Sequence, residues 1–135
     1  LKAEHNAPDT NDVFIPVENS VQFFDWFEKE YDLYPIYICP VQSKQSRLLW
    51  PSCSLMIDFG IGYGVNFQSE RPINLFSRLE KKMFELNGRK LFYTKSNVDE
   101  LTMWKSLKAN KQDYELIKKK YDPTNKYLTL YDKIH

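Results

Sequence analysis

The order in which strand-like and helix-like patterns follow one another constrains the fold more than any other feature of this sequence. Short runs rich in β-branched and aromatic residues predict strands, and apolar residues spaced three and four apart predict helices. From the N-terminus these patterns predict strand, helix, strand, strand, helix and strand, followed by further helices. The predicted segments are 12–17, 19–32, 34–41, 54–61, 72–87, 89–95, 97–107 and 111–120.

This order of elements is that of the ferredoxin-like fold, the split β-α-β-β-α-β arrangement. We therefore expect an α+β domain with a four-stranded antiparallel sheet, two helices on one face and additional C-terminal helices. The other face of the sheet is rich in tyrosine and phenylalanine, and such a face is either covered or used. Residues 1–11 are polar and predict a linker or a frayed terminus, so the domain covers 12–135.

The helix boundaries carry their own signals. Asn19 with Gln22, and Asn97 with Glu100, have the spacing of capping boxes at helix N-termini. Gly88 is predicted to end the second helix in the left-handed conformation. The first helix is predicted to bury one apolar face, formed by Val21, Phe24, Phe27 and Tyr31.

The charge balance excludes several functional classes. Nineteen basic and eighteen acidic residues give a net charge of +1, which offers no general attraction to nucleic acid or to an anionic membrane. An RNA-recognition module shares the order of elements, but its third strand carries basic and aromatic residues, whereas 54–61 carries Asp58. No apolar run approaches the roughly 20 residues that span a bilayer. We expect a cytoplasmic protein, or one held at a membrane periphery through a larger parent.

Cysteine and histidine are too few for most metal or covalent chemistry. Cys39 and Cys53 predict reduced thiols and not a disulfide framework. Both histidines lie near the chain ends, which argues against a zinc site and a histidine-based triad. The glycines of segment 60–64 are a weak nucleotide-binding signal, because no helix begins directly after them.

Alternation along the predicted strands brings a few polar residues to the sheet face away from the core. Leu55, Ile57 and Phe59 form the predicted core face of the third strand, so Asp58 points to the opposite face. A carboxylate in that position is either solvated or hydrogen-bonded in a pocket. In the second strand, Tyr37 and Cys39 share one face.

Tyr93 and Lys95 share a face of the predicted fourth strand and would form a polar pair there. A phenol has a reference pKa near 10 and can donate a proton when a cation lies close to it. A tyrosine in a strand also serves purely structural roles, so both interpretations of Tyr93 stay open at this level.

Several segments resemble the sterol delta-24-reductase branch of FAD-linked oxidases of the vanillyl-alcohol-oxidase type. YPIYICPV at 34–41 is similar to their Y-P-I-W-L-C-P stretch, and SLMIDFGIGYG at 54–64 to their L-Y-I-D-I-G-x-Y-G stretch. The segment LEKKMFELNGRKLFY, the LTMW helix start and the final LYDKI follow in the same order, and KKKYDP resembles a signature found more widely in FAD-linked oxidases. The resemblance extends from about residue 13 to residue 134.

The resemblance implies a C-terminal cap, or substrate domain, whose sheet covers the isoalloxazine ring of FAD. The FAD-binding domain of such a protein is absent from this chain, so the chain alone is expected to be inactive and to need that domain as its partner. Hydride transfer at the flavin would act on a small-molecule substrate, sterol-like or another apolar alcohol or alkene. By the same resemblance Tyr93 is the candidate catalytic residue, and Tyr37 and Asp58 are substrate-side candidates. Lys95 and Cys39 are added as substrate-side candidates because they share strand faces with Tyr93 and Tyr37.

A second interpretation keeps the fold and removes the chemistry. A stand-alone ferredoxin-like domain that senses a ligand or dimerises would have the same order of elements. It would fold without a partner domain, and its second sheet face would be closed.

Overall fold

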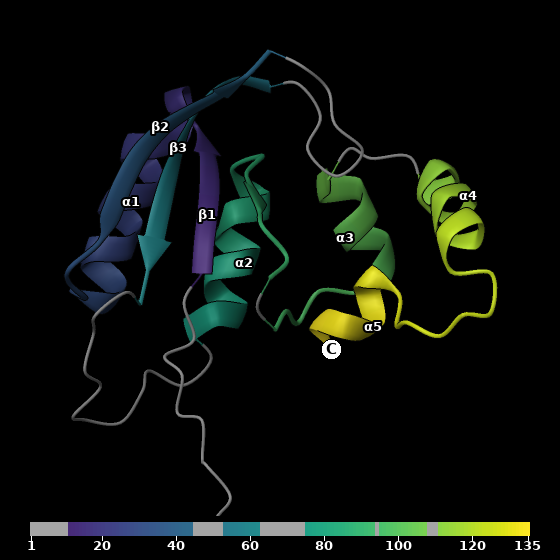
Figure 1. Ribbon diagram of the computed structural model, residues 1–135. Helices are drawn as coiled ribbons and strands as arrows, with labels where there is room; N and C mark the ends of the chain where they lie inside the picture. Colours follow the sequence, from purple (N-terminus) through teal and green to yellow (C-terminus); the bar gives the residue numbers. More distant parts are fainter. Residues whose placement is uncertain (1–10, 45–52, 63–74, 94, 108–110) are drawn as a thin grey trace, which may run out of the picture.

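The computed structural model describes residues 11–44, 53–62, 75–93, 95–107 and 111–135. Within them the chain forms strands and helices in the predicted order (Figure 1). The elements are β1 (Asn11–Pro16), α1 (Val17–Tyr31), β2 (Tyr37–Ser43), β3 (Cys53–Ile61), α2 (Leu75–Glu85), β4 (Arg89–Lys90), α3 (Glu100–Leu107), α4 (Lys111–Tyr121) and α5 (Leu130–Ile134).

The four strands form one sheet in the order β2-β3-β1-β4, and every neighbouring pair is antiparallel. This is the order expected for the ferredoxin-like arrangement, so the predicted fold class is confirmed. The N-terminal strand is central, because β1 pairs with both β3 and β4. Strands β2 and β3, which follow one another in sequence, pair antiparallel, and their register places Cys39 opposite Asp58.

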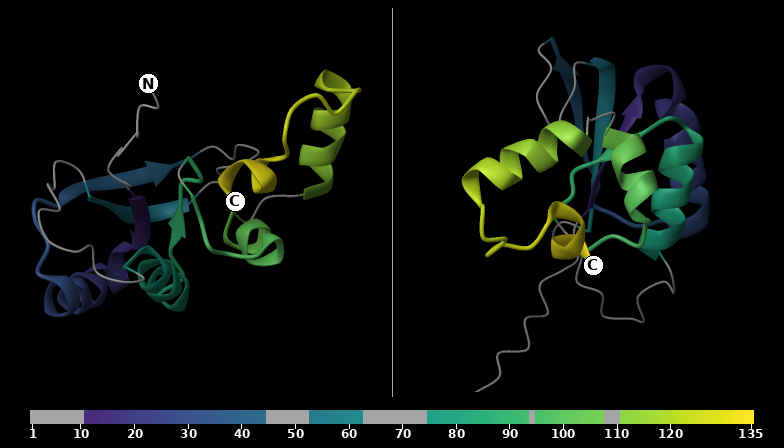
Figure 2. Two further views of the ribbon diagram at one scale, coloured as in Figure 1. Left: turned by 90° about the horizontal axis from the view of Figure 1, so that it is seen from below. Right: turned by 90° about the vertical axis from the view of Figure 1, so that its right-hand side faces the viewer.

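The main core lies between the sheet and two helices. Helices α1 and α2 lie side by side on one face of the sheet (Figure 2, left). Because side chains alternate along a strand, one set from β1 and β3 faces these helices. The buried core residues are Val13, Ile15, Phe23, Phe27, Phe59, Ile61, Leu75, Leu79, Met83 and Leu86.

A smaller core joins the C-terminal helices to the edge of the sheet. It contains Val98, the apolar side of α3 and Ile134 of α5. Helix α4 touches this cluster through Tyr114, whose hydroxyl accepts a hydrogen bond from the backbone N–H of Leu130 at 2.8 Å. The rest of α4 extends away from the sheet and from the smaller core, on the side of the sheet opposite α1 and α2 (Figure 2). The described side chains of α4 include none that is fully buried.

The start of α1 differs from the prediction. The helix begins at Val17, directly after Pro16, and Asn19 does not cap it. The Asn19 side-chain amide instead donates a hydrogen bond to the carbonyl of Leu86, 3.1 Å away. Phe23 and Phe27 are the buried residues of α1, and Phe24 and Tyr31 pack partly buried against the same core. Val21, which the pattern placed on the buried face, is 70% exposed.

The predicted fourth strand is too long. Strand β4 ends at Lys90, and farther along the chain Ser96 and Asn97 are hydrogen-bonded to Glu80 of α2 instead of to a strand. The Glu80 carboxylate accepts hydrogen bonds from the Ser96 hydroxyl at 2.7 Å and from the Asn97 backbone N–H at 3.1 Å. Asn97 is therefore engaged with α2 and does not cap α3. Asp99 takes that role by accepting the backbone N–H of Thr102 at 3.0 Å.

The end of α2 is also assigned to the wrong residue by the sequence pattern. Asn87 adopts the left-handed conformation, with φ of 57°, where Gly88 was expected to do so. Gly88 is required for a different reason, since a Cβ there would lie 2.7 Å from the carbonyl oxygen of Phe14 and 2.8 Å from Cδ1 of Ile15. The glycine lets the turn pack directly against β1.

Candidate functional site

The sheet face away from α1 and α2, here called the outer face, carries the polar residues that the sequence singled out. One row across it runs through Cys39 of β2, Asp58 of β3, Phe14 of β1 and Arg89 of β4. Although the two core helices lie on the other side, Phe14, Asp58 and Arg89 are nearly buried. The predicted orientation of Asp58, away from the core face, is confirmed by this register.

Asp58 is the most perturbed acid of the described residues. Its side chain is 8% exposed, and its Oδ1 has no hydrogen-bond partner in the part of the chain that the structure describes. Desolvation by burial and, secondly, the negative charge of nearby Asp12 raise the pKa of Asp58 to about 7. Near neutral pH this carboxyl is present in both forms, so it can donate or accept a proton.

Tyr37 and Cys39 lie beside Asp58 on the outer face. The hydrogen bond and the electrostatic interaction with Cys39, then desolvation, then the charges of Asp58 and Asp12, raise the pKa of the Tyr37 hydroxyl. The phenol therefore stays protonated at neutral pH and remains a hydrogen-bond donor. Three of the predicted substrate-side residues thus lie together, and Asp12 joins them as a fourth polar group.

Asp12 is a site residue that sequence reasoning missed. It lies in β1, opposite Gly60, which in turn lies opposite Tyr37 in β2. Its place near Asp58 depends on the β1–β3 register, and the sequence carries no direct signal for that register. Of the three residues expected in the core from β3, Phe59 is buried there and Ile57 packs against it partly buried. Leu55 is 39% exposed and lies outside this core.

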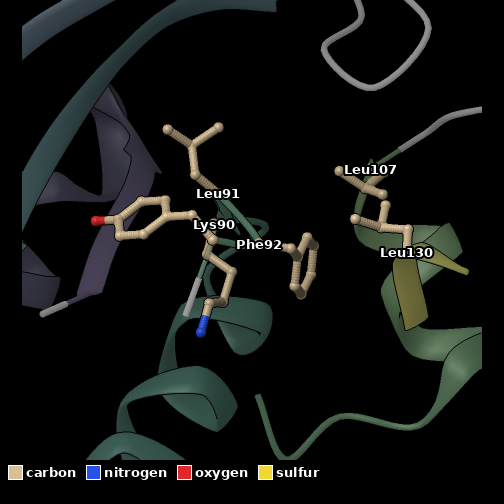
Figure 3. Close-up of a pocket in the computed structure, with 6 residues that line it drawn as sticks. Lys90, Leu91, Phe92, Leu107 and Leu130 are labelled. Atoms are coloured by element: carbon tan, nitrogen blue, oxygen red, sulfur yellow. The ribbon is translucent and has the colours of Figure 1, made fainter. Parts of the chain in front are cut away.

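Tyr93 and Lys95 do not form the polar strand pair that the sequence predicted. Both follow the end of β4, on a segment that has left the sheet, and both side chains are exposed. Tyr93 contributes to the wall of a pocket of about 230 Å³, together with Leu91, Phe92 and Leu107 (Figure 3). This pocket lies at the β4 edge of the sheet, whereas Tyr37 and Cys39 belong to the opposite edge strand.

A buried ion pair supports the β4 edge from the core side. Lys90 is fully buried, and its ammonium donates to Glu80 at 2.7 Å and to the Asn11 side chain at 2.6 Å. Glu80, which is 3% exposed, completes its hydrogen bonding with the 96–97 segment. This network ties β1, β4, α2 and the start of the C-terminal region together, so its role is structural.

Among the described residues, His, Cys, Asp and Glu form no group of three or more that could hold a metal ion. Across the same residues, no helix combines the length and the apolar character needed to cross a membrane.

Comparison with known proteins gives one distant relative. No family model matches the chain, and no solved structure matches it. The Delta(24)-sterol reductase of Arabidopsis thaliana is 22% identical over 153 residues, an alignment that covers 96% of this chain and 26% of the relative. The chain spans about a quarter of the length of that protein. It is thus a distant homologue of one part of a sterol reductase.

Proposed function

We propose that this chain is the substrate-side cap of an FAD-dependent oxidoreductase, with the outer face of its sheet turned toward the flavin and the substrate. The observation that carries the proposal is the buried Asp58 carboxyl, whose Oδ1 lacks a partner among the described residues and whose pKa is raised to about 7. Strongly perturbed carboxyls of this kind are typical of functional sites. The distant similarity to a reductase favours redox chemistry.

The outer face has groups that suit a flavin and an apolar substrate. An unsatisfied, mostly buried carboxyl such as Asp58 is stabilised when a ligand N–H or O–H occupies its free oxygen. Tyr37 adds a phenol that is 55% exposed on the edge strand β2 and can be reached from solvent. When bound, the flavin would supply hydride transfer. Residues of this chain would orient the substrate and hold a proton at Asp58 Oδ1 or at the Tyr37 hydroxyl.

The flavin nucleotide would be held mainly by a second domain. The aligned relative is about four times longer than the matched region, which leaves room for such a domain in a protein of this kind. The substrate would be a sterol-like molecule or another apolar alcohol or alkene. Tyr93, at the β4 edge, is the alternative to Asp58 and Tyr37: with the reacting group placed there, Tyr93 would act as the proton donor in double-bond reduction, or assist removal of a hydroxyl proton in alcohol oxidation. Lys95 and Cys39 would contribute to substrate binding.

The test uses the polypeptide encoded by the complete coding sequence that contains this chain. We expect it to bind FAD, whereas the 135-residue chain alone does not. Substituting Asp58→Asn should slow substrate-dependent flavin reduction by roughly 10²-fold while leaving the flavin content unchanged. The wild-type rate should depend on pH around 7, and this dependence should be absent in the Asp58→Asn variant.

Two outcomes would contradict the proposal. Stoichiometric FAD on the 135-residue chain would show that the nucleotide site lies within it. A complete polypeptide without flavin would favour the stand-alone ligand-sensing or dimerising domain instead. For Tyr93, the Tyr93→Phe variant should slow flavin reduction and Tyr127→Phe, at an exposed position, should not. Equal rates for the two variants would return Tyr93 to a structural role.

A further inference from the structure

The pocket beyond β4 is walled by three separate parts of the chain. The segment Lys90–Tyr93 forms one side, Leu107 at the end of α3 another, and Leu130 at the start of α5 the third. Figure 3 shows Leu107 and Leu130 facing the ring of Phe92 across an open space. Leu107 is 3% exposed and is held by the smaller core, so this wall is fixed by packing.

The walls are hydrocarbon, although one of the lining residues is a lysine. The Lys90 ammonium is directed away from the leucines (Figure 3) and is bound by Glu80 and Asn11 at 2.7 and 2.6 Å. The lysine therefore contributes its carbon stem to the pocket and not its charge. A polar ligand entering here would give up hydrogen bonds to water with little replacement, so the walls favour an apolar ligand.

We propose that this pocket binds an aromatic or branched hydrocarbon group of about ten carbon atoms. A dry cavity of about 150 Å³ lined by leucine and phenylalanine is large enough for benzene. The pocket here, at about 230 Å³, has room for a second fused ring. Phe92 offers an aromatic surface against which such a ring packs. Binding at this place requires no flavin and does not depend on the proposed function.

Naphthalene is the probe for this site. We expect saturable binding to the chain, with nuclear Overhauser effects between naphthalene protons and the methyl groups of Leu107 and Leu130. Leu130→Trp fills the pocket and should weaken binding at least tenfold. The matched control is Leu128→Trp, which makes the same substitution at a side chain that is 70% exposed and outside the pocket wall. Its affinity should equal that of the wild type.

A second variant keeps the test decisive if Leu130→Trp does not fold. Phe92→Leu removes the aromatic surface without blocking the space, and it should weaken naphthalene binding several-fold with the stoichiometry unchanged. Absence of saturable binding up to the solubility of naphthalene would overturn the proposal. Equal loss of affinity in Leu128→Trp and Leu130→Trp, or wild-type affinity in Phe92→Leu, would do the same.

Discussion

The buried ion pair between Lys90 and Glu80 offers the sharpest test of how this fold is held together. Replacing Glu80 with glutamine keeps the shape of the side chain and removes its charge. The amide oxygen could still accept from the buried Lys90 ammonium, but the ammonium would lose its counter-charge, and the amide nitrogen in place of Oε2 could no longer accept the backbone N–H of Asn97. An uncompensated buried cation is costly, because it has lost its hydration and has no counter-charge.

The expected loss of unfolding free energy follows from the contacts of Glu80. Its carboxylate accepts three hydrogen bonds, from Lys90, Ser96 and the backbone of Asn97. Breaking a buried pair by removing one partner costs about 3–5 kcal/mol. A domain of this kind has a free energy of unfolding of roughly 5–15 kcal/mol, so Glu80→Gln would remove a large part of it.

Urea unfolding followed by circular dichroism measures this loss, and Glu85→Gln is the matched control. Glu85 lies in the same helix and pairs with Lys82 at 3.5 Å, but its side chain is half exposed. Loss of a surface pair of that kind costs about 0.5 kcal/mol or less. With a urea slope near 2 kcal/mol/M, Glu80→Gln should lower the midpoint by about 2 M and Glu85→Gln by about 0.2 M. Coincident midpoints for the two variants would refute the reasoning.

Three further predictions concern stability. The pKa of Asp58 is about 7 in the folded chain and near 3.9 in the unfolded chain. Its contribution to the free energy of unfolding is therefore full below pH 4 and is lost as the pH rises to 7. Urea midpoints at pH 5 and pH 8 should show this loss in the wild type and not in Asp58→Asn. Gly88→Ala should cost about 1–3 kcal/mol, measured by thermal unfolding, because the new Cβ would meet the Phe14 carbonyl oxygen. Thr129→Ala breaks the capping box with Asp132 and should cost about 1 kcal/mol, seen as faster amide exchange in α5.

The order and type of the elements could be predicted from the sequence, because both depend on local periodicity. The errors fall where a distant contact replaces a local signal. Asn19 has the spacing of a cap but bonds to Leu86, 67 residues away in sequence. The pattern at 89–95 is that of a strand, but the strand ends at Lys90, and the Ser96 hydroxyl is hydrogen-bonded to Glu80 of α2.

Only the part of the candidate site that depends on strand alternation could be predicted from the sequence. Tyr37, Cys39 and Asp58 share the outer face because the parity was correct in both strands, although β2 begins at Tyr37 and ends at Ser43 where 34–41 was predicted. Asp12 was missed because its position depends on the register between β1 and β3. The placing of Tyr93 and Lys95 in the fourth strand was wrong, because that strand ends at Lys90.

The central position of β1 has a consequence for how this chain can be cut or rearranged. Residues 11–16 are the only link, within the described sheet, between the β2–β3 hairpin and β4. A protease or a truncation that removed them would leave the β2–β3 hairpin and β4 with no backbone pairing between them. During synthesis the same residues emerge before β3 and β4 and must stay without strand partners until β3 and then β4 have been made, so pairing of the sheet is completed late.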